Sequence, residues 1–126
     1  MNEFISTLQN VERSLSDERG AFNLFALFQR EDAPATWDLL IAAPWIEKDK
    51  AGALRRVSTE LQTSLDQDEL LKLSRVVIID QSNPALKAFQ RAIHVEHSDR
   101  EVRDSNFFGQ QIRHAHIITS RQTDHA

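Results

Sequence analysis

The chain of 126 residues contains no cysteine, which excludes disulfide bonds, thiolate nucleophiles and zinc–thiolate sites. It has only three glycines and three prolines, a composition that argues against collagen-like, linker-like and disordered chains. No apolar run approaches the roughly 20 residues of a membrane helix, and the first residues lack the basic and apolar segments of a secretory signal. We therefore expect a soluble, cytoplasmic protein with no membrane partner.

The common catalytic motifs are also missing. The sequence has no G-x-x-x-x-G-K-[ST] phosphate loop, no G-x-G-x-x-G turn and no G-x-S-x-G elbow, and its scattered glycines leave no room for a degenerate form. No cofactor is predicted. The formal net charge of −4 disfavours a broad nucleic-acid surface, so a nucleic-acid partner is not expected. These absences favour a binding module over an enzyme.

What remains is an ordinary globular composition, with 40% apolar and 27% charged residues. A chain of this length can bury a hydrophobic core without covalent staples. No repeat and no Pro/Gly/Ser-rich linker divides it. We expect one α/β domain over residues 1–119, followed by a frayed polar tail over residues 120–126.

Hydrophobic periodicity predicts the elements of the first half. Two short apolar runs, residues 22–28 and 37–43, predict strands that pair as a hairpin. Pro44 ends the second strand because it cannot donate to a ladder. A helix over residues 3–18 is predicted from an apolar stripe with helical spacing, formed by Phe4, Ile5, Leu8, Val11 and Leu15.

The second half adds two helices, a strand, a helix and two strands. The strand over residues 75–80 carries consecutive branched side chains, which favour an interior strand covered on both faces. Before this strand, the pattern predicts a helix from Lys48 to Leu65 and a short helix from Gln67 to Leu73 with a capping box. After it, a helix begins at Pro84. Two strands follow, over residues 101–108 and 112–118, joined by a turn at Phe108-Gly109-Gln110.

This order of elements predicts a mixed α/β fold: a single mixed sheet of four or five strands with helices packed on it. The segment between the strands at 37–43 and 75–80 is long enough for a right-handed crossover, so we expect these two strands to be parallel. The turn at 108–110 favours a terminal hairpin in which Ile112, His114, His116 and Ile118 share one face.

Parallel strands bring their carboxyl ends to one edge of the sheet, where open α/β sheets bind ligands. Trp45 and Glu47 follow the first of these strands, and Asp80, Ser82 and Asn83 follow the second. The sequence therefore predicts a ligand crevice at this edge. The alternative is structural: Trp45 as a core or rim aromatic, Asp80 as a turn or cap acceptor, and Glu47 as a charge favoured at a helix start.

His114 and His116 project from the same face of the last predicted strand, about 7 Å apart by strand rise. Two such imidazoles can bind a metal ion if a third ligand comes from His94, Glu96 or His97. No complete ligand motif is present, so no metal is predicted as the leading interpretation. The alternative is a half-exposed strand face whose histidines meet water or cross-strand partners.

Two further features bear on self-association. Residues 1–46 carry seven acidic and three basic side chains, whereas residues 81–126 contain all five histidines and a formal net charge of +1. Contact between these parts in two copies would depend on pH. The pair Phe107-Phe108 beside the turn either forms a contact surface or folds back onto the core.

The leading hypothesis is a small non-catalytic interaction or regulatory module that forms a homodimer or binds another protein. The alternative is a small hydrolase or phosphoryl-handling enzyme that uses the His-x-His strand or the crevice at the strand ends. An enzyme predicts that His114 and His116 converge with a carboxylate or a third histidine.

Overall fold

The computed structural model describes residues 2–122. Its elements are, in chain order, α1 (Asn2–Arg19), β1 (Leu24–Arg30), β2 (Trp37–Ala42), α2 (Pro44–Lys48), α3 (Lys50–Ser64), α4 (Gln67–Lys72), β3 (Leu73–Ile78), α5 (Pro84–Ala92), β4 (Arg100–Phe107) and β5 (Gln110–Ser120). The order matches the prediction with one added helix, α2. No helix among residues 2–122 combines the length and the apolar character that crossing a membrane requires.

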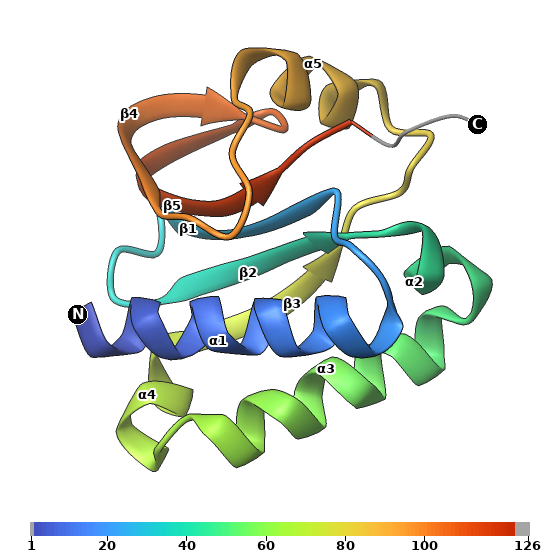
Figure 1. Ribbon diagram of the computed structural model, residues 1–126. Helices are drawn as coiled ribbons and strands as arrows, with labels where there is room; N and C mark the ends of the chain where they lie inside the picture. The colour runs from blue at the N-terminus through green and yellow to red at the C-terminus, as the bar shows by residue number, and fades with distance from the viewer. Residues whose placement is uncertain (1, 123–126) are drawn as a thin grey trace.

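The five strands form one mixed sheet in the order β3-β2-β1-β5-β4 (Figure 1). Strands β2 and β3 are parallel, and the other neighbouring pairs are antiparallel. The predicted single mixed sheet is therefore confirmed, and so is the parallel relation of the strands on either side of the α2–α4 segment. Figure 1 shows both of their arrowheads pointing to the same side of the molecule.

Helices cover both faces of this sheet. Helices α1 and α3 pack on one face, and α5 packs on the other (Figure 1). Between α1, α3 and the sheet lies the α1 core, a cluster of buried side chains that includes Leu8, Phe25, Leu39 and Val57. The predicted apolar stripe of the first helix is buried there in full. On the opposite face lies the α5 core, which includes Ala26, Leu40, Leu86, Phe89 and Ile117.

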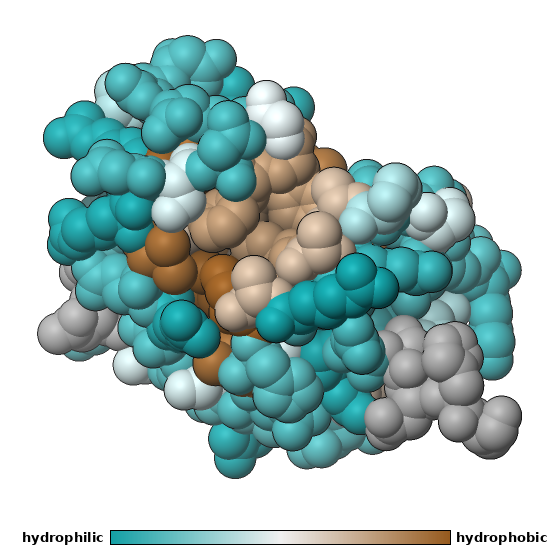
Figure 2. Space-filling model, turned by 90° about the horizontal axis from the view of Figure 1, so that it is seen from above, coloured by the Kyte–Doolittle hydropathy of each residue, from teal (hydrophilic) through white to brown (hydrophobic). Residues whose placement is uncertain are grey.

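The α5 face carries apolar side chains at its surface. Figure 2, which looks down on this face, shows a continuous apolar area bordered by hydrophilic residues. A shallow pocket of about 270 Å³ lies between α5 and the end of the β4–β5 hairpin, and it is lined by Ala85, Ala88, Phe89, Ala92, Asn106, Phe107 and Phe108. Small alanine side chains on α5 leave this space open.

Strand β3 lies at the edge of the sheet, with β2 as its neighbour. The prediction of an interior strand is therefore wrong, although side chains on both faces of β3 do pack, Val76 and Ile78 on the α1 core and Val77 on the α5 core. Val76, Val77 and Ile78 are half-buried, whereas β2 is buried along its whole length. A run of branched residues indicates that the faces of a strand are covered, but it carries no information about how many strands flank it.

The segment after β2 also differs from the prediction. Pro44 does end the strand, but it then occupies the first turn of α2, a helix that the sequence analysis did not separate from the loop. Ile46 of α2 is fully buried, so this short helix is part of the α1 core. Asp49 ends α2, and its side chain accepts a hydrogen bond from the Gly52 backbone at 3.0 Å to begin α3.

Two predicted helix starts are confirmed by their caps. Asp66 and Glu69 form the reciprocal hydrogen bonds of a capping box at the start of α4. Asn83 accepts a hydrogen bond from the Ala85 backbone, and Pro84 occupies the first position of α5. Strand boundaries were less accurate: β1 begins two residues later than predicted and β3 two residues earlier.

The β4–β5 hairpin closes through Phe108 and Gly109, whose φ angles of 54° and 75° match a two-residue turn of type I′. Farther along β5, Gln29 of β1 pairs with His114 and Arg30 pairs with Ile112, so Arg113 is an extra residue. This bulge turns Ile112 into the α5 core. The prediction that Ile112 shares a face with His114 is therefore wrong, because a bulge breaks the alternation.

Ser120, the first residue of the predicted tail, is the buried last residue of β5, and its hydroxyl donates to the Ile93 carbonyl at 2.7 Å. The backbone N–H of Arg121 donates to the Asn23 carbonyl at 3.0 Å. The rest of the tail, residues 123–126 with His125, lies outside the described residues.

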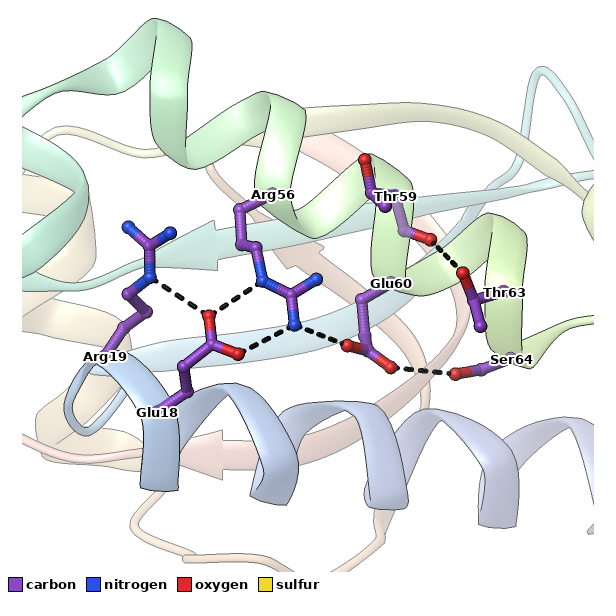
Figure 3. Close-up of polar contacts among 7 residues, drawn as sticks. All are labelled: Glu18, Arg19, Arg56, Thr59, Glu60, Thr63 and Ser64. Carbon is purple, nitrogen blue, oxygen red and sulfur yellow. Dashed lines mark hydrogen bonds and ion pairs between the residues drawn. The ribbon is translucent and has the colours of Figure 1, made fainter.

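A bidentate ion pair joins α1 to α3 (Figure 3). Arg56 donates to both carboxylate oxygens of Glu18, at 2.7 and 2.8 Å, and to Glu60 at 2.8 Å. The hydrogen bonds from Arg56 and then from Arg19 lower the pKa of Glu18 from 4.5 to about 2. Because the pKa is depressed in the folded state, this pair stabilises the fold above pH 4.5 and loses its effect as the pH falls toward 2.

We expect Arg56→Met to lower the melting temperature at pH 7, and we expect this loss to shrink as the pH falls from 4.5 toward 2. Thermal unfolding followed by circular dichroism at several pH values measures it. Arg55→Met, which removes an equal charge from the neighbouring exposed position, is the control and should change the melting temperature little. A loss that stays constant across this pH range would show that the ion pair is not its cause.

Candidate functional site

The carboxyl ends of β2 and β3 bring two predicted residues together. Lys50 Nζ lies 3.3 Å from Asp80 Oδ1 and 4.0 Å from Glu47 Oε2. Burial, followed by the nearby carboxyl group of Asp80, raises the pKa of Glu47. The hydrogen bonds from Glu47 and Lys50 lower the pKa of Asp80. Two carboxyl groups and a lysine therefore lie together at the edge where the sequence predicted a crevice.

The other crevice candidates do not join this pair. The Trp45 ring lies edge-on to Phe22 with centroids 5.5 Å apart. Ser82 is exposed, and Asn83 is occupied as the cap of α5. Trp45 borders a separate pocket of about 320 Å³, whose charged lining residues are Arg19, Lys48 and Arg121. The proposed crevice thus divides into a carboxyl pair on one side of α2 and an aromatic rim on the other.

Phe107 and Phe108 fold back toward the core. The Phe107 ring lies 4.9 Å from the Phe89 ring and 5.5 Å from the Phe28 ring, and the Phe108 ring lies 5.6 Å from the Phe89 ring. Both side chains remain half-buried. They therefore belong to the α5 core and also line the apolar pocket beside α5.

His114 and His116 come together on the α1 side of the sheet. Their ring centroids lie 4.7 Å apart, and the ring of Trp37 reaches both from β2, at 5.4 and 5.5 Å. His116 is 6% exposed, whereas the His114 side chain is 17% exposed. The two imidazoles thus form one cluster, with the indole of Trp37 as a wall.

Two carboxylates from the adjoining hairpin segment complete this cluster. Glu101 of β4 pairs in register with His116, and its Oε1 lies 2.7 Å from His114 Nε2. Asp99, just before β4, holds His116 Nδ1 at 2.8 Å. The hydrogen bond from His114, and then that from Arg103, lower the pKa of Glu101. The predicted convergence of the histidine pair with a carboxylate is present, but the carboxylate is Glu101.

The residues predicted as third ligands lie elsewhere. His97 Nδ1 lies 2.6 Å from Glu12 Oε1, and Glu96 pairs with Arg121 at 3.1 Å. His94 is exposed at the end of α5, where it borders a polar pocket. Among the described residues, none of these three belongs to the group whose ligand atoms lie within 4.8 Å of one another, which is formed by Glu101, His114 and His116.

Sequence reasoning also missed a buried polar network. Glu12 of α1 is fully buried, and its carboxylate accepts hydrogen bonds from Thr119 at 3.0 Å and from Ser16 at 3.1 Å, besides its contact with His97. An acid of the first third thus meets a histidine of the last third within one chain. The helical spacing does signal the burial of Glu12, which lies four residues after Leu8 and three before Leu15 on the apolar stripe, but nothing local indicates that His97 is its partner.

A comparison of the chain with protein-family models, with curated proteins and with solved structures finds no match. Three features remain as bases for a function. They are the free edge of β3, the Glu47–Asp80 carboxyl pair, and the cluster of Glu101, His114 and His116.

Proposed function

We propose that the chain is a non-catalytic interaction module that self-associates by pairing β3 with β3 of a second copy. The observation that supports this most is that β3 is an apolar edge strand without the features that normally keep edges apart. The proposal includes a cytoplasmic location, with which the cysteine-free composition is compatible.

The backbone of β3 offers alternate amides to a partner. The N–H of Ile79, just past the strand, donates to the Ile41 carbonyl of β2 at 2.9 Å. Because backbone groups alternate along a strand, Val77 and Arg75 also face β2, whereas Val76 and Ile78 turn their N–H and C=O groups outward. These outward groups are a template for a further strand.

The other edge of the sheet is guarded, and β3 is not. Strand β4 carries the charges of Arg100, Glu101, Arg103 and Asp104, and Asp104 has a φ of 49° that interrupts the regular extended backbone. In β3 the one charged residue is Arg75, whose guanidinium lies 3.2 Å from Asp38 of β2. The remaining length offers half-buried Val76, Val77 and Ile78.

A second copy of the chain can pair with this edge without any other protein. Antiparallel pairing of β3 with β3 of a second copy about a two-fold axis is self-complementary. The outward N–H and C=O groups of one copy then face the outward groups of the other. The sheet would then continue through both copies. Leu71, which is 72% exposed just before β3, would lie beside the new contact and lose solvent exposure.

Val76→Pro tests the proposal. Proline removes one outward N–H while keeping an apolar side chain and every hydrogen bond that β3 makes to β2. Sedimentation equilibrium should give twice the monomer mass of 14.5 kDa for the original chain and the monomer mass for the variant. Val76→Thr, which keeps the amide, is the matched control and should remain a dimer.

Circular dichroism must show that the proline variant is folded, and Ile78→Pro repeats the test at the second outward amide. An original chain that stays monomeric at high micromolar concentration would refute the proposal. So would a dimer that survives both proline variants. A dimer that Phe107→Ser or Phe108→Ser dissociates instead would place the contact on the α5 face, as the sequence analysis allowed.

One observation favours the alternative of a metal-dependent hydrolase. The imidazoles of His114 and His116 converge with the carboxylate of Glu101, which is the donor set of many hydrolytic zinc sites. Metal binding by this cluster can be tested whether or not β3 pairs with a second copy.

A further inference from the structure

We propose that Glu101, His114 and His116 bind one divalent transition-metal ion, with Zn²⁺ as the best fit. One ligand atom from each residue lies within 4.8 Å of the other two. Ligands of zinc, at about 2.0–2.2 Å from the ion, lie on the order of 3.3 Å apart. Small rotations of the side chains close this difference, and Glu101 is free to make them because its side chain is 44% exposed.

His116 supplies the observation that points most directly to a ligand. The residue is 6% exposed, and its buried Nε2 has no hydrogen-bond partner in the protein. A buried polar atom left in this way costs about 1–3 kcal/mol unless something satisfies it. A metal ion on Nε2 would satisfy it, with Glu101 of the adjoining strand directly across from His116.

Asp99 orients this imidazole for the same role. Its Oδ1 lies 2.8 Å from His116 Nδ1, so the carboxylate favours the tautomer with the proton on Nδ1 and the lone pair on Nε2. A carboxylate behind a ligating histidine is the usual support of a metal-bound imidazole. Asp99 is therefore a positioning residue of the proposed site.

The side chains of His114 and Glu101 contact each other directly, at the position that the ion would occupy. Their contact, Nε2 to Oε1 at 2.7 Å, joins an imidazole nitrogen and a carboxylate oxygen that are both metal ligands. Binding of the ion would displace the proton shared between them and release it to solvent. Two imidazoles and one carboxylate suit zinc and other borderline transition metals, whereas Ca²⁺ and Mg²⁺ require mainly oxygen ligands.

The surroundings leave a position open and provide a reporter. The partly exposed Glu101 and His114 form the solvent side of the cluster, so a water molecule or another small ligand can complete the coordination. Trp37, with its ring centroid 5.4 and 5.5 Å from the two imidazoles, is close enough for its fluorescence to report the ion. The site lies on β4 and β5, at the opposite end of the sheet from β3.

Titration calorimetry of the full chain without a polyhistidine tag, with ZnCl₂ as the probe, tests the proposal. We expect one ion per chain with a dissociation constant in the micromolar range or below. Asp99→Asn should weaken binding about 10–100-fold, and His114→Ala or Glu101→Gln should weaken it at least as much. His94→Ala, an exposed histidine outside the cluster, is the matched control and should leave the affinity unchanged.

A second readout excludes a merely structural effect. In the Trp45→Phe background, Co²⁺ should quench the fluorescence of Trp37, and Glu101→Gln should abolish this quenching at equal metal concentration. Glu101 is half-exposed, so its variant is expected to fold, and circular dichroism checks that it does. Binding weaker than millimolar in the original chain, or an affinity unchanged by both His114→Ala and Glu101→Gln, would overturn the proposal. Loss of β3-mediated dimers would not affect either result.

Discussion

Phe25→Ala is expected to lower the free energy of unfolding by about 3–5 kcal/mol. Phe25 lies in β1, which is flanked by β2 and β5, and its side chain is fully buried in the α1 core. Its ring also meets that of Phe22 edge-on, with centroids 5.0 Å apart. A domain of this size has a total stability of about 5–15 kcal/mol, so this single cavity removes a large share of it.

Urea denaturation measures the loss as a lower midpoint with an unchanged slope. Phe107→Ala is the matched control, because the same ring is removed from a half-buried position at the hairpin end. It should cost about 1–2 kcal/mol, in proportion to the smaller area returned to water. A larger loss for Phe107→Ala than for Phe25→Ala would mean that the α1 core does not contribute most of the stability.

His97→Ala should lower the free energy of unfolding by about 2–4 kcal/mol. The variant leaves the fully buried carboxylate of Glu12 with its hydrogen bonds from Ser16 and Thr119 but without the partner at 2.6 Å. The expected loss is smaller than for a wholly buried pair, since the His97 side chain is 39% exposed.

The double variant Glu12→Gln/His97→Ala tests this cause. The backbone conformation of residue 97 is common to both proteins and cancels, whereas the amide at residue 12 no longer leaves a buried carboxylate without this partner. Relative to Glu12→Gln alone, the effect of His97→Ala should therefore be much smaller than in the original chain. An undiminished effect in the Glu12→Gln background would show that the imidazole stabilises the fold through packing rather than through the carboxylate.

Local patterns in the sequence predicted most of the elements. The apolar stripe of α1, the capping box at Asp66 and the proline start of α5 depend on residues close together in the chain, and each is confirmed. The parallel relation of β2 and β3 also followed, because the helical segment between them is long enough to cross the sheet.

The lateral position of β3 could not be predicted in this way. Branched side chains from Val76 to Ile79 reflect burial on the two faces of the strand, and the neighbours of a strand in the sheet depend on contacts far away in the chain. The bulge at Arg113 could not be predicted for the same reason, since it is defined by the pairing of β5 with β1, which lies far away in the chain.

Part of the geometry of the proposed metal site could have been predicted. A two-residue turn at Phe108 and Gly109 fixes the register of the hairpin, and this register places Glu101 opposite His116. The turn and both strands are predicted from local patterns, and counting residues outward from the turn gives this pairing. By contrast, the contact of Trp37 with both imidazoles spans three strands, and nothing in the local sequence indicates it.

Hydrogen exchange at the amides of β3 tests self-association through this edge most directly. At a protein concentration where the chain sediments as a dimer, we expect Val76 and Ile78 to exchange as slowly as Val77, whose amide faces β2. On dilution to the monomer, Val76 and Ile78 should exchange rapidly while Val77 stays protected. Rapid exchange of Val76 and Ile78 in the dimer would refute pairing through β3, because it would leave the outward amides of β3 in water.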